Sequence, residues 1–220
     1  MDTDQASVPR YKKMLILGAT GKTGRELIDI ALARGHHVTA FVRSPAKITR
    51  RDQRLTVVKG DPRGVEELCT VLAGHDVVLS ALGPTPKEAM TRSTLLQECA
   101  SSAMAAMKRT DVHRFLIVSS AMLFPGGGPI PAFLRFLLRP HVRDLKAMED
   151  VVKATTVEWT IARPPRLVSA ADESYRAQPG GLPPGATLLN SVMSWRAVAA
   201  FMIDSAEKGH HLHEVVGICR

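Results

Sequence analysis

Three glycines near the start of the chain have the spacing of a phosphate-binding turn. Gly18, Gly21 and Gly24 lie three residues apart in the stretch ILGATGKTG. This Gly-x-x-Gly-x-x-Gly pattern is typical of a strand-turn-helix unit that binds a dinucleotide, and it would support hydride chemistry with NAD(P). The same stretch contains Gly21-Lys22-Thr23, which is like the end of a P-loop and would instead indicate phosphoryl transfer from a nucleoside triphosphate.

The surroundings of the turn decide between these two interpretations. A P-loop needs a glycine five residues before Gly21, and Ile16 stands there, inside an apolar segment. The later apolar run VVLSALG ends in Leu82-Gly83 and so supplies no acidic residue for magnesium. The glycine triplet, in contrast, directly follows an apolar strand and opens a helix, whose free N–H groups would face a pyrophosphate. We therefore predict a dinucleotide site.

The end of the second predicted strand indicates which dinucleotide is bound. NAD-binding folds place an acidic residue there to hold the ribose 2′-hydroxyl, whereas this strand ends in Arg43 and Ser44. A guanidinium attracts a 2′-phosphate, which a carboxylate would repel. Lys47 and Lys22 are placed to contribute to the same pocket. Arg43 therefore favours NADP(H), and a solvated arginine after a strand is the alternative.

Strand and helix patterns alternate around these residues. Short apolar runs of the buried, parallel type alternate with segments whose apolar residues recur at helical spacing. The predicted strands are Met14–Leu17, Val38–Val42, Leu55–Val58, Val77–Leu82, Phe115–Val118, Trp159–Ala162 and Val215–Ile218. The predicted helices are Gly24–Arg34, Val65–Leu72, Ser93–Arg109, Asp144–Lys153 and Ser194–Ser205. This order predicts an α/β protein with a single doubly wound, Rossmann-type parallel sheet and helices on both faces.

The predicted organisation is one domain with two irregular segments late in the chain. A chain of 220 residues is long enough to bury a single core. We predict a flexible polar arm at residues 1–12 and an NAD(P)-binding domain at residues 13–220. The segments around 124–140 and 169–185 are rich in Pro and Gly, and we expect them to be loops that cover a substrate.

The first of these segments is both apolar and basic. Its stretch PIPAFLRFLLRPHVR would suit a membrane-surface segment, or a lid in which Phe133, Phe136, Leu137 and Leu138 cover the substrate. Because the stretch is short and bounded by prolines, we favour the lid.

The bulk composition limits the class of partner and the compartment. The chain is 45% hydrophobic and 23% charged, with a formal net charge of +8. Its basic residues are scattered without interleaved aromatics, which favours a phosphate-bearing small ligand over nucleic acid. The isolated cysteines, polar N-terminus and lack of a long apolar window predict a cytoplasmic protein without a signal peptide or membrane span. We expect a small-molecule hydride acceptor, and a monomer or weak homo-oligomer.

The order of these motifs resembles a known family. The relevant stretches are LILGATGKTG, VTAFVRSPAKI, Gly60-Asp61, DVVLSALG, VHRFLIVSSAML, MEDVVKATTVEWTIARPPRL and SWRAVAAFMID. Together they are similar to an atypical short-chain dehydrogenase/reductase of the NmrA-like, NAD(P)H-binding family, and particularly to its biliverdin reductase B/flavin reductase group. The resemblance implies a Rossmann fold, NADP(H) as cofactor and oxidoreductase activity.

The resemblance also implies roles for individual residues at the ends of the predicted strands. The implied cofactor-binding residues are Gly18, Thr20, Gly21, Lys22, Thr23 and Gly24 at the pyrophosphate, Arg43 and Ser44 at the 2′-phosphate, Asp61 beside the adenine, Ala81, Leu82 and Gly83 at the nicotinamide ribose, and Ser119, Pro164, Pro165 and Arg166 around the nicotinamide. The candidate catalytic residues are Ser119, Ser120 and Lys146. Strand-end capping by the serines and a solvated helix lysine are the alternatives.

The sequence departs from ordinary short-chain dehydrogenases at their catalytic acid. Those enzymes protonate a carbonyl oxygen with the tyrosine of a Tyr-x-x-x-Lys pair. The tyrosines here are Tyr11 and Tyr175, and the residues four positions beyond them are Leu15 and Pro179. We therefore predict hydride transfer to a flat conjugated acceptor, such as a flavin, a quinone or a linear tetrapyrrole, whose proton comes from water.

Two functions of different class are open at this point. The first is an NADPH-dependent reductase, and the second is a non-catalytic NADP(H)-sensing protein that regulates a protein partner. The residues expected at the nicotinamide favour the reductase. We expect no metal at His210, His211 and His213, because Glu214 is the one carboxylate at supporting spacing.

Overall fold

Strands and helices alternate along the chain. The computed structural model describes residues 12–84 and 93–220, so the predicted N-terminal arm, residues 1–12, lies outside the described residues except for Lys12. The strands are β1 (Lys13–Leu17), β2 (His37–Val42), β3 (Leu55–Lys59), β4 (Val77–Ser80), β5 (Arg114–Val118), β6 (Glu158–Arg163), β7 (Arg166–Val168), β8 (Arg176–Pro179), β9 (Val192–Ser194) and β10 (Glu214–Cys219). The helices are α1 (Lys22–Ala33), α2 (Val65–Leu72), α4 (Leu95–Arg109), α5 (Pro129–Leu137), α6 (Arg139–Lys153) and α7 (Trp195–Lys208).

The main sheet has the strand order β3-β2-β1-β4-β5-β6-β10-β8. Neighbouring strands from β3 to β10 are parallel, and β8 pairs with β10 in the antiparallel direction. The short strands β7 and β9 form a separate parallel pair. The direction in which the chain adds strands reverses between β1 and β4, and doubly wound sheets bind ligands at such a switch point.

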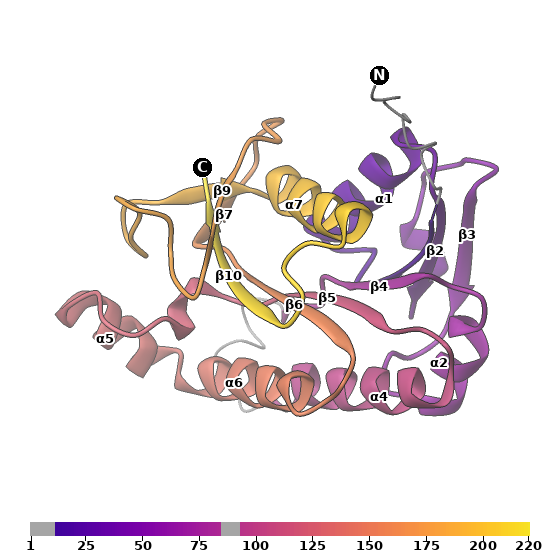
Figure 1. The fold of residues 1–220 in the computed structure, drawn as a ribbon, viewed down its shortest axis with the longest axis horizontal. Helices are drawn as coiled ribbons and strands as arrows, with labels where there is room; N and C mark the ends of the chain where they lie inside the picture. Colours follow the sequence, from indigo (N-terminus) through magenta and orange to yellow (C-terminus); the bar gives the residue numbers. More distant parts are fainter. Residues whose placement is uncertain (1–11, 85–92) are drawn as a thin grey trace, which may run out of the picture.

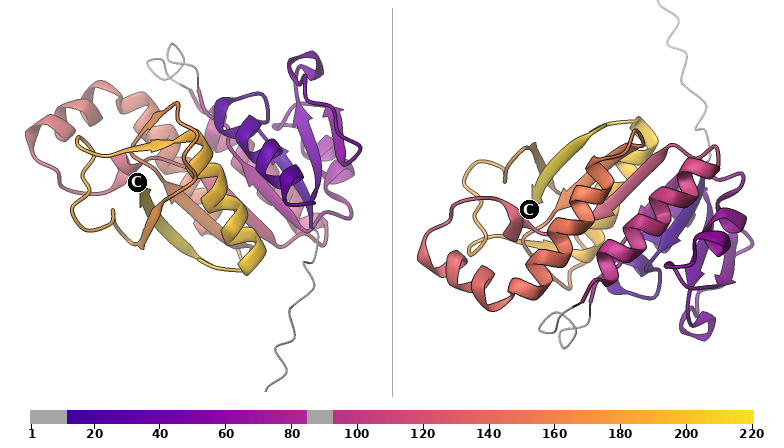
Figure 2. Two further views of the ribbon diagram at one scale, coloured as in Figure 1. Left: turned by 90° about the horizontal axis from the view of Figure 1, so that it is seen from above. Right: turned by 90° about the horizontal axis from the view of Figure 1, so that it is seen from below.

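Helices cover both faces of this sheet (Figures 1 and 2). Helices α1 and α7 lie on one face, and α2, α4 and α6 lie on the other. Each layer has its own apolar core. The predicted α/β class, with one doubly wound Rossmann-type sheet, is confirmed.

The two cores explain why the first strand has no polar residue in its interior. Met14 and Ile16 of β1 pack in the core beneath α1 and α7, whereas Leu15 and Leu17 pack in the core on the opposite face. Side chains alternate between the faces of a strand, so a strand covered on both faces must be apolar throughout.

The segment 124–140, expected to be a loop, is mostly helical. Pro129 and Pro131 stand in the first turn of α5, and Pro140 stands in the first turn of α6. The first-turn N–H groups of a helix have no partner within that helix, so proline is tolerated there and fixes a helical φ. The prolines thus begin helices here, and α6 begins at Arg139 and not at Asp144 as predicted.

Other elements also differ from the prediction. Within the expected loop 169–185, residues Arg176–Pro179 form the edge strand β8, where proline is tolerated because one side of the strand lacks a partner. The predicted strand Val77–Leu82 ends at Ser80, and Ala81 to Pro84 leave the sheet. No helix within residues 12–84 and 93–220 is both long and apolar enough to span a bilayer.

Candidate functional site

The glycine turn joins β1 to α1 as predicted. The backbone N–H of Gly21 donates to the carbonyl oxygen of Gly18 at 3.0 Å, which closes the turn. Helix α1 then begins at Lys22, with no side-chain cap and no acidic residue in its first turn. Its first N–H groups are therefore free to bind an anionic group, and the helix dipole favours that group.

Gly18 and Gly24 allow close approach between backbone segments. Gly18 has a φ of +79°, and a Cβ there would lie 2.7 Å from the carbonyl of Ala81. A Cβ on Gly24 would overlap the carbonyl oxygen of Gly18. A larger residue at either position would therefore push α1 or the β4 end away from the turn.

A pocket of about 490 Å³ lies beside this turn, within the usual volume range of ligand sites. It is lined from the carboxyl ends of β1, β2, β3 and β4 and from the start of α7. The lining residues are Gly18, Thr20, Gly21, Lys22, Thr23, Arg43, Lys47, Asp61, Pro62, Ala81, Leu82, Gly83, Pro84, Leu95, Cys99, Leu167 and Trp195. The structure thus brings together most of the residues expected to bind the cofactor.

The pocket has a cationic side at the end of β2. Arg43 and Lys47 are exposed there, and Asp61 faces the same pocket from the end of β3. The carboxylate of Asp61 accepts a hydrogen bond from Arg63 at 2.6 Å. This bond with Arg63 is the main reason that the pKa of Asp61 is lowered, against the opposing effect of burial. Arg63 therefore offsets the negative charge of Asp61, which leaves Arg43 and Lys47 for an anion.

Lys22, which was predicted at the pyrophosphate, contacts Trp195, a pocket residue that the sequence did not predict. The Nζ atom of Lys22 lies 4.0 Å from the centroid of the Trp195 ring. Trp195 is the first residue of α7, directly after Ser194, whose hydroxyl caps the helix by accepting from the N–H of Ala197 at 2.8 Å. The contact fixes Lys22 across the mouth of the glycine turn.

Cys99 also lines the pocket but is not a reactive thiol. Burial raises the pKa of the Cys99 thiol to about 11. The side chain is therefore neutral at ordinary pH and acts as an apolar wall.

Ser119, at the end of β5, belongs to a buried polar network. Its hydroxyl donates to Oε1 of Glu149 at 2.6 Å. The same carboxylate accepts from Arg163 at 2.6 and 2.8 Å and from Lys153 at 2.7 Å. Glu149 is 1% exposed. It was not singled out in the sequence, where a glutamate in a helix gives no sign that it is buried.

The partners of Glu149 keep it charged. Burial raises the pKa of Glu149, but the hydrogen bonds from Arg163, Lys153 and Ser119 together outweigh burial and hold the pKa below its ordinary value. Since the Ser119 proton points at this carboxylate, the free lone pairs of the hydroxyl can only accept a hydrogen bond from a ligand.

Other residues expected near the nicotinamide do not line the pocket. Ser120 accepts from the N–H of Met122 and caps the short 3₁₀ helix that follows β5. Lys146 is exposed on α6. The residues predicted at the site but absent from the pocket lining are Gly24, Ser44, Ser119, Ser120, Lys146, Pro164, Pro165 and Arg166. Their roles toward a nicotinamide stay predictions.

Tyr175 is not placed to act as an acid in this pocket. Its hydroxyl donates to Asp204 at 2.6 Å, and burial is the first cause of its raised pKa. Tyr11 lies outside the described residues.

His210 and His211 contact residues of neighbouring strands. His211 lies 2.7 Å from Glu214, and Arg114 donates to the carbonyl oxygen of His210 at 2.8 Å. Within residues 12–84 and 93–220, no three His, Cys, Asp or Glu side chains are grouped to hold a metal.

The expected lid does not cover the pocket. Phe133 and Phe136 of α5 are 64% and 63% exposed, and Leu137 is 53% exposed. Helix α5 projects from one end of the molecule in Figure 1. None of these side chains lines the cofactor pocket, so their expected contact with a substrate stays a prediction.

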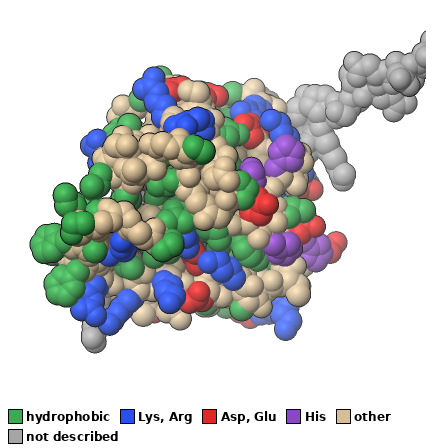
Figure 3. Space-filling model, turned by 60° about the vertical axis from the view of Figure 1, so that its left-hand side comes forward, with side chains coloured by type: hydrophobic (Ala, Val, Ile, Leu, Met, Phe, Trp, Pro, Cys, Tyr) green, Lys and Arg blue, Asp and Glu red, His purple; other side chains and the backbone are tan. Residues whose placement is uncertain are grey.

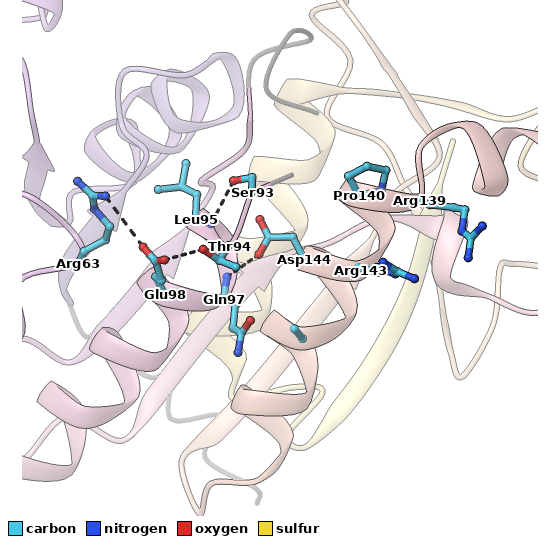
Figure 4. A pocket seen from close by; sticks show the side chains of 11 residues that line it. Arg63, Ser93, Thr94, Leu95, Gln97, Glu98, Arg139, Pro140, Arg143 and Asp144 are labelled. Carbon is cyan, nitrogen blue, oxygen red and sulfur yellow. Dashed lines mark hydrogen bonds and ion pairs between the residues drawn. The ribbon is translucent and has the colours of Figure 1, made fainter. Parts of the chain in front are cut away.

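A larger cavity, of about 710 Å³, adjoins the cofactor pocket at Leu95 (Figure 4). It lies between the starts of α4 and α6. Its acidic groups have partners: Asp144 accepts from the N–H groups of Leu96 and Gln97 at 3.1 and 3.0 Å, and Glu98 accepts from Thr94. Because this cavity lacks a glycine turn, we assign the dinucleotide to the smaller pocket.

The fold and the pocket define an NAD(P)-binding Rossmann protein of the oxidoreductase type. More specifically, the chain belongs to the NAD(P)H-binding family, whose model matches residues 18–208. The dinucleotide predicted from the glycine turn is thus confirmed at the level of NAD(P)H.

The chain is also similar to several known proteins. The chain is 26% identical over 213 residues to the uncharacterised protein YwnB of Bacillus subtilis, covering 92% of this chain and 95% of YwnB. It is 30% identical over 181 residues to the oxidoreductase stcQ of Emericella nidulans, covering 70% of this chain but 64% of stcQ. A proposed epimerase from Bacteroides thetaiotaomicron is 28% identical, with a TM-score of 0.78 over 96% of this chain and 97% of that protein.

Proposed function

We propose that the protein is an NADPH-dependent reductase of a flat conjugated acceptor, such as a flavin, a quinone or a linear tetrapyrrole. The observation that carries the proposal is a dinucleotide pocket in which no tyrosine of the described chain serves as an acid. Bound NADPH would supply a hydride. A conjugated acceptor takes that hydride and gains its proton from water, so it needs no strong acid from the protein.

The cationic side of the pocket supports NADPH over NADH. Arg43 and Lys47 line the pocket at and after the end of β2, and dinucleotide-binding folds bind the ribose 2′-position at the end of that strand. Two cationic side chains favour binding of a 2′-phosphate. The negative charge of the nearby Asp61 is offset by its ion pair with Arg63. The dinucleotide would be held at its pyrophosphate by the start of α1.

Ser119 would position a ligand at the nicotinamide end of the site. Its hydroxyl is fixed by Glu149, which is itself held by Arg163 and Lys153. A hydroxyl that donates to a carboxylate can orient a ligand N–H group but is poorly suited to protonate an alkoxide. One relative is named an oxidoreductase and another a proposed epimerase, so the proposed reaction rests mainly on the residues of this pocket.

Steady-state oxidation of NADPH tests the proposal. We expect turnover with flavins, quinones or biliverdin that exceeds turnover with simple ketones by roughly 10²-fold or more, because a missing general acid costs about that factor. Ser119→Ala should slow turnover without abolishing it. Thr56→Ala, on an exposed position of β3, is the control and should not change it. NADPH binding without oxidation of any of these acceptors would instead favour a protein that senses NADP(H).

A further inference from the structure

The outward face of α5 is an unusual concentration of apolar side chains. Six large hydrophobic residues are exposed in the described chain, and four of them lie on this helix. They are Ile130, Phe133, Phe136 and Leu137, each more than half exposed, and we refer to them as the α5 face. Single exposed apolar residues are common, but a contiguous patch marks a surface that binds something.

The orientation of α5 is fixed from its other side. Pro131 is buried, and Leu134 and Leu138 are half-buried toward the body of the protein. Arg135 donates to the backbone carbonyl oxygens of Phe124 at 3.3 Å and Gly126 at 2.6 Å. Because these contacts hold the inner face, the α5 face must point outward.

Basic residues surround the α5 face, and acidic residues are missing from its part of the sequence. Residues 112–143 contain no Asp or Glu. The guanidinium of Arg139 lies 5.3 Å from the centre of the Phe136 ring, and Arg143 follows one turn later on α6. In Figure 4 both arginine side chains point away from Glu98. Figure 3 shows hydrophobic side chains protruding from one side of the molecule with basic side chains beside them.

We infer that the α5 face binds the surface of an anionic phospholipid membrane. The phenyl rings would enter the boundary between head groups and acyl chains, while Arg139 and Arg143 would lie at the lipid phosphates. At nine residues, α5 is suited to lie on a bilayer, not to cross it. A second copy docked through the same face would bring the arginines of both copies together, and like charges oppose that contact. The inference does not depend on the proposed reaction.

Flotation with lipid vesicles tests this inference. Full-length protein should float with vesicles of phosphatidylglycerol and phosphatidylcholine, and much less with phosphatidylcholine alone. The double variant Phe133→Ser/Phe136→Ser should lower the partition coefficient at least about tenfold, because two apolar anchors are lost. Leu212→Ser, another exposed leucine outside α5, should leave it unchanged. These positions are exposed, so thermal midpoint and NADPH affinity should stay as in the wild type.

A charge-matched pair of variants separates specific docking from the general attraction of a basic protein. Arg139→Gln/Arg143→Gln should weaken binding by about fivefold for each arginine, because a basic group near an anionic surface contributes about that factor. Arg51→Gln/Lys108→Gln removes the same charge elsewhere and should have a smaller effect.

Three results would overturn the inference. The first is wild-type protein that fails to float with the anionic vesicles. The second is a double phenylalanine variant that floats as well as the wild type, which would mean that charge alone causes the binding. The third is a dimer in light scattering that the phenylalanine variant abolishes, with no vesicle binding, which would assign the α5 face to a second copy.

Discussion

Arg43 is the residue on which the choice of cofactor depends. It is exposed at the end of β2, beside Lys47 and in the same pocket as the glycine turn. Arg43 was recognisable from the sequence, because it occupies the place where an NAD-binding fold carries an acid. Glu149 was not, because two of its partners, Ser119 and Arg163, lie outside α6, and the sequence around Glu149 does not show these contacts.

Arg43→Glu should reduce or reverse the preference for NADPH. We expect the wild-type protein to bind NADPH at least about tenfold more tightly than NADH, a difference of about 1.4 kcal/mol. A carboxylate at this position would repel the 2′-phosphate and leave the rest of the pocket intact. Isothermal titration with both nucleotides measures the ratio. Arg51→Glu makes the same charge change at an exposed arginine outside the pocket lining, and it should leave the ratio of the two affinities unchanged. Equal wild-type affinities would refute the role of Arg43.

Glu149→Gln should destabilise the protein in a pH-dependent way. The pKa of Glu149 is below its ordinary value of 4.5 in the folded protein, so its stabilisation is present above that pH and is lost as the pH falls through the folded pKa. In urea unfolding near neutral pH we expect a loss of about 3 kcal/mol, because Arg163 loses its buried partner. The difference from wild type should shrink in acid. A difference that stays constant with pH would mean that the charge of Glu149 does not contribute.

At the scale of elements, the turn between β1 and α1 holds the pocket together. Gly18 contacts the chain after β4, and Gly24 contacts Gly18, so three segments meet without side chains between them. The elements were largely predictable, because the main-sheet strands contain short apolar runs, as in β1 and β5, and the apolar residues of the long helices recur at helical spacing. Helix α5 was not predicted, because a segment rich in Pro and Gly is typical of a loop, whereas proline is tolerated in the first turn of a helix, where it stands here.

Gly24→Ala should loosen this turn. The new Cβ would overlap the carbonyl oxygen of Gly18, so α1 must shift from β1. We expect the free energy of unfolding to fall by about 2 kcal/mol, as in other overpacked sites. NADPH affinity should fall as well, because the first N–H groups of α1 move with the helix. Gly181→Ala is a control in open space, where nothing lies near the added Cβ. An unchanged NADPH affinity in Gly24→Ala would contradict this account of the turn.

At the scale of the whole molecule, the sheet order explains why the pocket forms where it does. The carboxyl ends of β1 to β4 meet on one edge, at the point where the strand order reverses. The order of strands and helices in the sequence was sufficient to predict this edge and the residues of the glycine turn. It could not place Trp195 or Leu167, which reach the pocket from segments more than a hundred residues after the turn. Such contacts depend on tertiary packing and not on local pattern.

A single-turnover measurement tests the central claim most directly. The protein, in excess over NADPH, would be mixed rapidly with a flavin or a quinone while the absorbance of the reduced nicotinamide is followed. The same measurement with NADPH deuterated at the transferred position reports on the hydride step. The account predicts acceptor-dependent loss of this absorbance, slowed by deuterium, and much slower loss with NADH or with Arg43→Glu. NADPH that binds tightly but is oxidised by neither acceptor would contradict it.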